Sequence, residues 1–172
     1  MNEIEKIEQF YSDLVPPLYR FVRNIVVNSH DAEDVVADTF VKIIELAYTE
    51  KSIPSKAFCF TVARNLAIDF LRRKKKITYN SVFIDELQLT ANIDLFEDIS
   101  LSEDVATIEK HLSEFPELPS NVFYLRYFHD LSFKEISKIM NISENNARII
   151  TFRVKKKLRN TFDELRRKTD ER

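Results

Sequence analysis

The chain of 172 residues contains no glycine, and this absence limits which folds it can adopt. Glycine is the residue that most readily takes the positive-φ conformation of tight turns, so Asn or Asp must occupy those positions here. Loops that bind phosphate in P-loop and dinucleotide-binding proteins also need glycine, and neither motif is present. Few tight turns, together with many Glu, Lys, Leu and Ile residues, favour helices. We therefore predict an all-α protein.

Charge divides the chain into three blocks. The net charge is −2 overall, with +1 over residues 1–76, −8 over residues 77–115 and +5 over residues 116–172. An acidic segment between two near-neutral or basic blocks is typical of two domains joined by a linker. We predict two small helical domains, at residues 1–76 and 102–172, joined by an acidic linker at residues 77–101.

Apolar residues recur every three or four positions in the first block, which predicts a series of amphipathic helices. Pro16 and Pro17 interrupt the first stripe, so we expect two short helices there. We expect Asp31 to cap the next helix and Ser55 to cap a third. The inward face of that third helix is predicted to include Phe58.

The third helix ends in a dense cationic run. Within "ARNLAIDFLRRKKK", residues 63–76, the last five residues are all Arg or Lys. A helix C-terminus alone favours cations by about 0.3–1 kcal/mol, but five exceed what capping requires, and DNA phosphates are the alternative partner. Phe58 and Phe60 can stack on unpaired bases or pack in the core. Core packing is favoured for Phe58, and both roles stay open for Phe60.

The second block contains a predicted helix-turn-helix. Ser132 and Glu135 form a capping box that opens a short helix. Asn141 follows where the turn between two helices needs positive φ, and Ser143 caps a longer helix. The inward face of that helix is apolar and its outer face is polar and cationic, which is typical of a DNA-recognition helix.

No catalytic or metal-binding motif stands out. The acids at Asp31, Glu33, Asp34 and Asp38 are consistent with a solvated helix face, a protein-binding face or, with further converging groups, a catalytic site. The three histidines show no ligand spacing, so we predict neither metal nor cofactor. Cys59 is the only cysteine, and we expect it in the core of a protein in a reducing compartment. With no apolar run of membrane-spanning length and an acidic, polar N-terminus, we predict a cytoplasmic protein that is not an enzyme.

Three stretches together resemble the bacterial RNA polymerase sigma factors of the extracytoplasmic-function (ECF) type. "DAEDVVADTFVKIIE" is similar to the helix of that family that binds core polymerase. "KAFCFTVARNLAIDFLRRKKK" is similar to its promoter-melting and minus-ten recognition helix. "LPSNVFYLRYFHDLSFKEISKIMNISENNARIITFRVKKKLR" is similar to its minus-thirty-five domain. The order of the stretches and the acidic linker between them also match.

The resemblance implies a role for each group of residues. Asp34, Asp38 and Phe40 would dock on the β′ clamp helices of core RNA polymerase. The minus-ten strand would be contacted by Arg64, Asn65, Asp69, Arg72 and Arg73, with Phe60 as the candidate that stacks on bases. The minus-thirty-five element would be contacted by Asn145, Asn146, Arg148, Ile149, Phe152, Arg153, Lys155 and Lys156.

The leading hypothesis is thus a sigma factor that directs core RNA polymerase to promoters, recognises minus-thirty-five DNA and melts minus-ten DNA. Its partners would be core polymerase, promoter DNA and, as a further candidate, an anti-sigma factor, without membrane insertion. A stand-alone helix-turn-helix regulator that uses only residues 116–172 is the alternative. An enzyme built on the acids of residues 31–38 is a third hypothesis.

Overall fold

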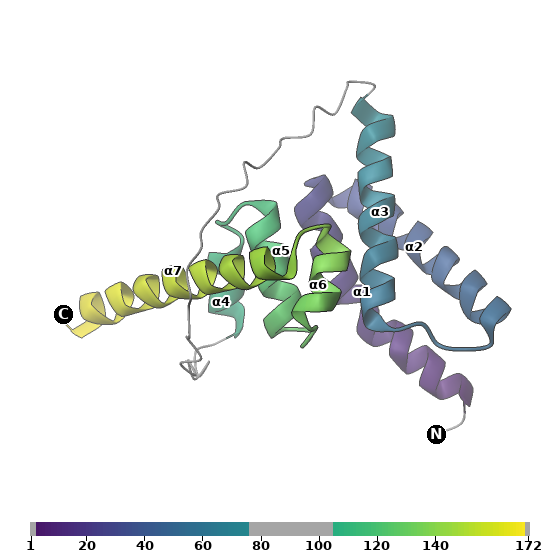
Figure 1. The fold of residues 1–172 in the computed structure, drawn as a ribbon, viewed down its shortest axis with the longest axis horizontal. Coiled ribbons are helices and arrows are strands. Elements are labelled where there is room, and N and C mark those ends of the chain that lie inside the picture. The colour runs from purple at the N-terminus through teal and green to yellow at the C-terminus, as the bar shows by residue number, and fades with distance from the viewer. Residues whose placement is uncertain (1–2, 76–104, 171–172) are drawn as a thin grey trace.

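A computed structural model describes residues 3–75 and 105–170 of the chain, and all regular structure in them is helical (Figure 1). This confirms the prediction of an all-α fold. We call α1–α3 the first domain and α4–α7 the second. The predicted linker at residues 77–101 lies outside the described residues. The helices are α1 (Glu3–Val26), α2 (Ser29–Glu50), α3 (Lys56–Lys75), α4 (Val105–Leu112), α5 (Glu117–Tyr127), α6 (Phe133–Met140) and α7 (Glu144–Asp170).

The two prolines do not break the first helix, so the prediction of two short helices is wrong. Pro16 and Pro17 lie inside the continuous helix α1, on the turn between Leu14 and Leu18. Proline removes a backbone N–H donor and disfavours a helix interior. Leu14, Leu18 and Phe21 are all buried on one face of α1, so tertiary packing holds the helix together across the prolines.

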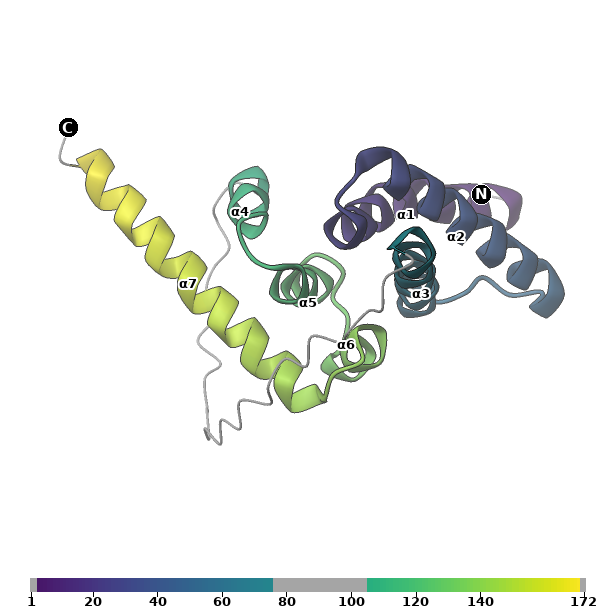
Figure 2. The ribbon, with the colours of Figure 1, turned by 90° about the horizontal axis from the view of Figure 1, so that it is seen from above.

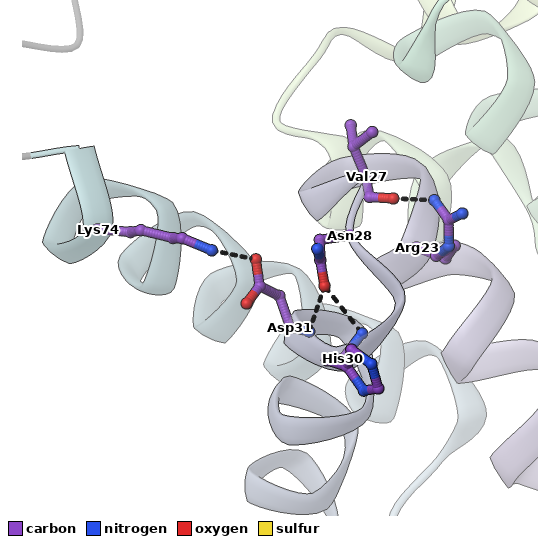
Figure 3. Close-up of polar contacts among 6 residues, drawn as sticks. All are labelled: Arg23, Val27, Asn28, His30, Asp31 and Lys74. Atoms are coloured by element: carbon purple, nitrogen blue, oxygen red, sulfur yellow. Dashed lines mark hydrogen bonds and ion pairs between the residues drawn. The ribbon is translucent and has the colours of Figure 1, made fainter.

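The turn between α1 and α2 also differs from the prediction. Asn28, not Asp31, caps α2, because its Oδ1 accepts hydrogen bonds from the backbone N–H groups of His30 (2.9 Å) and Asp31 (3.1 Å). The carboxylate of Asp31 instead pairs with the side-chain ammonium group of Lys74 on α3, at 2.6 Å (Figure 3). The extra turn of α2 therefore places Asp31 within reach of the cationic end of α3.

Positive φ angles occur at four described residues, and only two of them are the expected Asn or Asp. Asp130 and Asn141 fit the prediction, whereas Val27 (φ 67°) and Lys51 (φ 51°) do not. A β-branched residue is rarely found in this conformation. The carbonyl oxygen of Val27 accepts a hydrogen bond from Arg23 of the preceding turn, which helps to hold the strained link (Figure 3).

The inward face of α3 departs from the prediction at Phe58, whereas Leu66 and Phe70 pack against the core. Ser55 caps it as expected, since its Oγ accepts a hydrogen bond from the backbone N–H of Phe58 at 3.2 Å. The side chain of Phe58, however, is 41% exposed, whereas Phe60 is fully buried. The small residues Ala63 and Ala67 are also fully buried and allow close packing against neighbouring helices. Because α3 is buried on two sides, its buried residues do not follow the one-sided apolar spacing on which the prediction relied.

The helix-turn-helix follows the prediction residue by residue. The backbone N–H of Glu135 donates to Ser132 Oγ at 3.2 Å, and the Glu135 carboxylate accepts from the backbone N–H of Ser132 at 2.8 Å. The Ser132 hydroxyl also donates to the Glu135 carboxylate at 2.6 Å, and this bond, followed by the one from the Ser132 backbone N–H, lowers the pKa of Glu135. Asn141 ends α6 with φ 55° and ψ 49°. Ser143 Oγ then accepts from the N–H of Asn146 at 3.1 Å at the start of α7.

The two domains pack against each other through a continuous apolar core. Helix α6 lies beside α3, and α5 lies between α1 and α7 (Figure 2). Core residues of the first domain belong to the same cluster as Leu125, Leu131, Ile136 and Ile139 of the second. A smaller cluster inside the second domain joins α4 and α5 to α7 and contains Ile108, Leu112, Phe123, Val154 and Leu158.

Candidate nucleic-acid and protein interfaces

The outer face of α2 combines acidic and apolar side chains. Asp34 and Asp38 are exposed and lie one turn apart. Val41 and Tyr48 continue the same face at the next turns and are 55% and 82% exposed. Solvent-exposed large apolar side chains beside carboxylates are typical of a surface that binds a partner. We call Asp34, Asp38, Val41 and Tyr48 the docking face.

Two members of the docking face were not predicted from the sequence. Val41 and Tyr48 continue the spacing of Asp34 and Asp38 at seven and fourteen residues from Asp34, and this pattern would have found them. Phe40, which was predicted, is half-buried and packs edge-on against Tyr11 of α1, with ring centres 5.7 Å apart. Phe40 therefore packs against α1 and is not among the exposed side chains of the docking face.

The exposed side of α3 carries four of the six predicted minus-ten residues. Asn65, Asp69, Arg72 and Arg73 are all exposed. Arg72 pairs with Asp69 at 3.1 Å, one turn earlier on the helix. Both side chains are largely in water, so this ion pair is weak and leaves the guanidinium available to a phosphate. We call these four residues the minus-ten face.

The other two predicted residues of α3 lie at the junction with the second domain. The ring of Phe60 lies between Phe21, with ring centres 5.2 Å apart, and His129 of the second domain, at 5.0 Å. Of the two roles left open for Phe60, the structure shows core packing, since its ring is fully buried in this arrangement of the domains. Arg64 is half-buried, and its Nε atom is fully buried. Phe58, assigned to the core from its spacing, is the aromatic side chain of this helix that is exposed.

The outer face of α7 displays the predicted minus-thirty-five residues. Of these, the exposed ones are Asn145, Asn146, Arg148, Arg153 and Lys156, and the half-buried ones are Ile149, Phe152 and Lys155. We call these eight residues the recognition face. Because they follow the tight turn at Asn141 in a helix-turn-helix, they occupy the part of the motif that enters a major groove.

Arg148 is held over an aromatic ring of the neighbouring helix. Its guanidinium carbon lies 4.6 Å from the ring centre of Phe133 on α6. A second guanidinium, that of Arg126, lies 5.1 Å from the same ring. Arg126 is itself anchored, because it donates a hydrogen bond to the carbonyl oxygen of Leu131 at 3.0 Å. The ring of Phe133 thus forms a fixed platform beneath the recognition face.

Residues 3–75 and 105–170 contain no group of three or more His, Cys, Asp or Glu side chains arranged to hold a metal ion. Cys59 is fully buried, as predicted, and burial raises the pKa of its thiol to about 11. In those same ranges, no helix has the length and apolarity needed to cross a membrane.

Two family models match the chain, one in each domain. The model for sigma-70 region 2 matches residues 10–77, and that for sigma-70 region 4 matches residues 106–158. Together these matches span more than half of the chain. The chain belongs to the sigma-70 family, as an RNA polymerase sigma factor of the ECF type. The stand-alone regulator is not favoured, because the first domain also matches a sigma-factor region.

Individual relatives agree with this assignment. The chain is 29% identical over 158 residues to the ECF RNA polymerase sigma factor SigM of Bacillus subtilis, covering 91% of this chain and 95% of the relative. It is 28% identical over 142 residues to the RNA polymerase sigma factor SigV of the same organism, covering 82% and 81%. The fold is similar to that of the sigma factor RpoE from Bartonella quintana, solved in complex with the anti-sigma factor NepR. That match has a TM-score of 0.58 at 18% identity and covers 92% of this chain and 98% of the solved one.

Proposed function

We propose that this sigma factor uses its three surfaces in one sequence of events at a promoter. The docking face binds the β′ clamp helices of core RNA polymerase, the recognition face enters the major groove of the minus-thirty-five element, and the minus-ten face binds the melted strand. The observation that carries the proposal is that one chain presents a partner-binding face and two separate faces suited to DNA. We assign residues 1–76 to polymerase binding and melting, 77–101 to the linker and 102–172 to minus-thirty-five recognition.

No catalysis by this chain is needed for that role. Arg72 and Arg73 contact phosphates, while Asn65 offers hydrogen bonds to the edges of unpaired bases. Phe58 takes the place of Phe60 as the candidate that stacks on a base, because its ring is exposed at the start of α3. Trapping unstacked bases in this way offsets an unstacking cost of a few kcal/mol. The protein therefore shifts an equilibrium of the DNA and leaves the chemistry to the polymerase.

The partners follow from the same role. Core polymerase and promoter DNA are the first two, and their use places the protein in the cytoplasm. The solved relative RpoE was crystallised with an anti-sigma factor. An anti-sigma factor is therefore a further candidate partner for this chain.

The test is reconstituted transcription with sigma-free core polymerase. Adding the purified protein should give promoter-dependent transcripts from DNA of its own genome. Asp34→Ala combined with Tyr48→Ala should lower the affinity for core polymerase at least about tenfold, since truncation of interface anchors commonly costs more than 1 kcal/mol each. Glu50→Ala is the matched control, because it removes an exposed acid near the end of α2 and outside the docking face.

Each surface is judged by its own result. Absence of both a core complex and a transcript from every cognate promoter tested would refute the sigma-factor mechanism. Full affinity of the Asp34→Ala/Tyr48→Ala variant for core polymerase would refute only the docking face.

A further inference from the structure

Lys74, near the end of α3, is joined to the first turn of α2 by an ion pair. Its Nζ atom lies 2.6 Å from Oδ2 of Asp31 (Figure 3). The Asp31 side chain is only 17% exposed, and a carboxylate with so little access to water needs a charged or hydrogen-bonding partner. The ammonium group of Lys74 supplies that partner, so the two helices are tied together at this point.

The Asp31 end of the pair is held in place by its own turn. Asn28 Oδ1 accepts a hydrogen bond from the backbone N–H of Asp31 at 3.1 Å, which fixes the first turn of α2. The link before that turn is also held, because Arg23 donates a hydrogen bond to the carbonyl oxygen of Val27 (Figure 3). Asp31 therefore presents its carboxylate to α3 from a fixed position.

The Lys74 end of the pair is supported by the first domain. Its Nζ atom lies 5.7 Å from the ring centre of Phe70, one turn earlier on α3. Phe70 in turn packs against the apolar core. Because the ammonium group has both a carboxylate and an aromatic ring as partners, the Lys74 side chain loses much of the freedom that a lysine ordinarily keeps at a surface.

This pair determines which way the last turn of α3 faces. Successive residues of an α-helix are about 100° apart, so Arg72 lies about 200° around α3 from Lys74. With Lys74 directed toward α2, Arg72 points to the opposite side, where its side chain is 69% exposed. Helix ends fray when nothing holds them. The anchor at Lys74 therefore keeps Arg72 and Arg73 in one orientation.

We propose that Asp31 is a positioning residue for the minus-ten face and acts through Lys74. Lys74 anchors the end of α3, while Arg72 and Arg73 are the cations that the anchor directs toward the melted strand. The inference rests on the proposed function and deepens it, because it gives the helix that carries the docking face a second role in DNA capture. Asp31 lies one turn before Asp34, so a test must separate this role from polymerase binding.

The direction of one charge effect tests the assignment. Asp31→Asn removes a negative charge near a DNA-binding surface, so electrostatic attraction alone would strengthen DNA binding. Loss of positioning predicts the opposite result. We expect holoenzyme reconstituted with Asp31→Asn to melt a promoter about two- to fivefold less well than the unmodified holoenzyme, which is the range by which exposed ion pairs shift an equilibrium. Melting is measured as the reactivity of unpaired minus-ten thymines with permanganate, on a promoter that the protein transcribes.

Three further variants complete the test. Lys74→Arg keeps the ion pair and should melt the promoter normally. The double variant Asp31→Asn/Lys74→Gln keeps the net charge of the unmodified protein and should be as defective as Asp31→Asn. Glu33→Gln is the matched control and should leave melting unchanged, because it removes an equal charge from the same turn of α2 and its carboxylate lies 3.7 Å from His30. If Asp31→Asn loses its helical circular dichroism, Asp31→Ser replaces it, since serine is well tolerated near a helix start.

Affinity for core polymerase, measured for each variant, should not change. A loss of core affinity that accounts for the whole melting defect of Asp31→Asn would make Asp31 part of the docking face and overturn the assignment. Melting by Asp31→Asn that equals or exceeds that of the unmodified protein would also overturn it. An unmodified protein that starts no transcript with core polymerase refutes the proposed function itself, whereas one that transcribes and is insensitive to Asp31→Asn refutes only the positioning role.

Discussion

Replacing Phe133 should weaken promoter discrimination without removing any group that contacts DNA. The ring of Phe133 supports the guanidinium of Arg148 at 4.6 Å, and the anchored Arg126 lies at 5.1 Å from the same ring. Arg148 is exposed, so water would otherwise allow its long side chain many conformations. Phe133→Leu keeps an apolar side chain against the core and removes the aromatic face. We therefore expect it to release Arg148 from its position.

The magnitude follows from the exposure of the pair. A cation over an aromatic ring at an exposed site contributes about 0.5–1 kcal/mol. A bidentate contact from arginine to guanine discriminates by about 1–3 kcal/mol, and that contact depends on a fixed guanidinium. Phe133→Leu should therefore lower the affinity ratio between the cognate minus-thirty-five duplex and a single-base variant about two- to fivefold. Arg148→Ala should lower the same ratio further, by the full value of the base contact.

A double-mutant cycle on the reconstituted holoenzyme measures the coupling. The four proteins are the unmodified chain, Phe133→Leu, Arg148→Ala and the double variant, each titrated with both duplexes. Phe133→Leu should have no effect on discrimination once Arg148 is absent. Phe115→Leu is the matched control, since the Nζ of Lys157 lies 4.8 Å from its ring and neither residue belongs to the recognition face. An equal loss for Phe133→Leu with and without Arg148 would show that the ring acts on folding alone.

Two further predictions concern the turn at Val27 and the domain junction. Val27→Gly should raise the free energy of unfolding by about 1 kcal/mol, measured by denaturant titration, because it relieves positive φ at a side chain that is 71% exposed. Burial first, then the charges of Lys56 and Arg20, lower the pKa of His129 to about 4. The packed arrangement of the two domains therefore binds fewer protons than a separated one with an ordinary histidine. It is fully stable above about pH 6.5 and loses stability as the pH falls toward 4. Small-angle X-ray scattering should show the protein expanding over that pH window, and His129→Gln should show a smaller pH dependence. Identical pH profiles for the unmodified protein and His129→Gln would contradict the prediction on His129. A lower free energy of unfolding in Val27→Gly would contradict the prediction on Val27.

The features predicted correctly are those that depend on residues close together in sequence. The capping box of Ser132 and Glu135, the left-handed Asn141 and the cap at Ser143 each involve backbone groups within a few positions. Such hydrogen bonds are set by local geometry, so residue type and spacing are enough to place them. The residues of the recognition face were predicted from the family resemblance, and their contacts with DNA stay a prediction.

Apart from the local cap at Asn28 and the positive φ angles of Val27 and Lys51, the wrong predictions involve packing between distant segments. Pro16 and Pro17 remain helical because buried neighbours on the same face of α1 hold that helix in place. Phe60 is buried because His129 and Phe21 enclose it, and a sequence period cannot show a contact with a residue 69 positions away. Spacing assigned Phe58 to the core for the same reason. Tertiary structure therefore exposes Phe58, which spacing assigned to the core, and buries Phe60, for which both roles were open.

The packed arrangement of the two domains affects the two DNA-binding surfaces unequally. The second domain docks through α5 and α6, whereas the recognition face lies on the outer side of α7, where Arg148, Arg153 and Lys156 are exposed. On α3, Phe60 and the Nε atom of Arg64 are buried, whereas Phe58 is exposed. The recognition face is thus accessible while Arg20 still pairs with Glu109, because neither residue lies on α7.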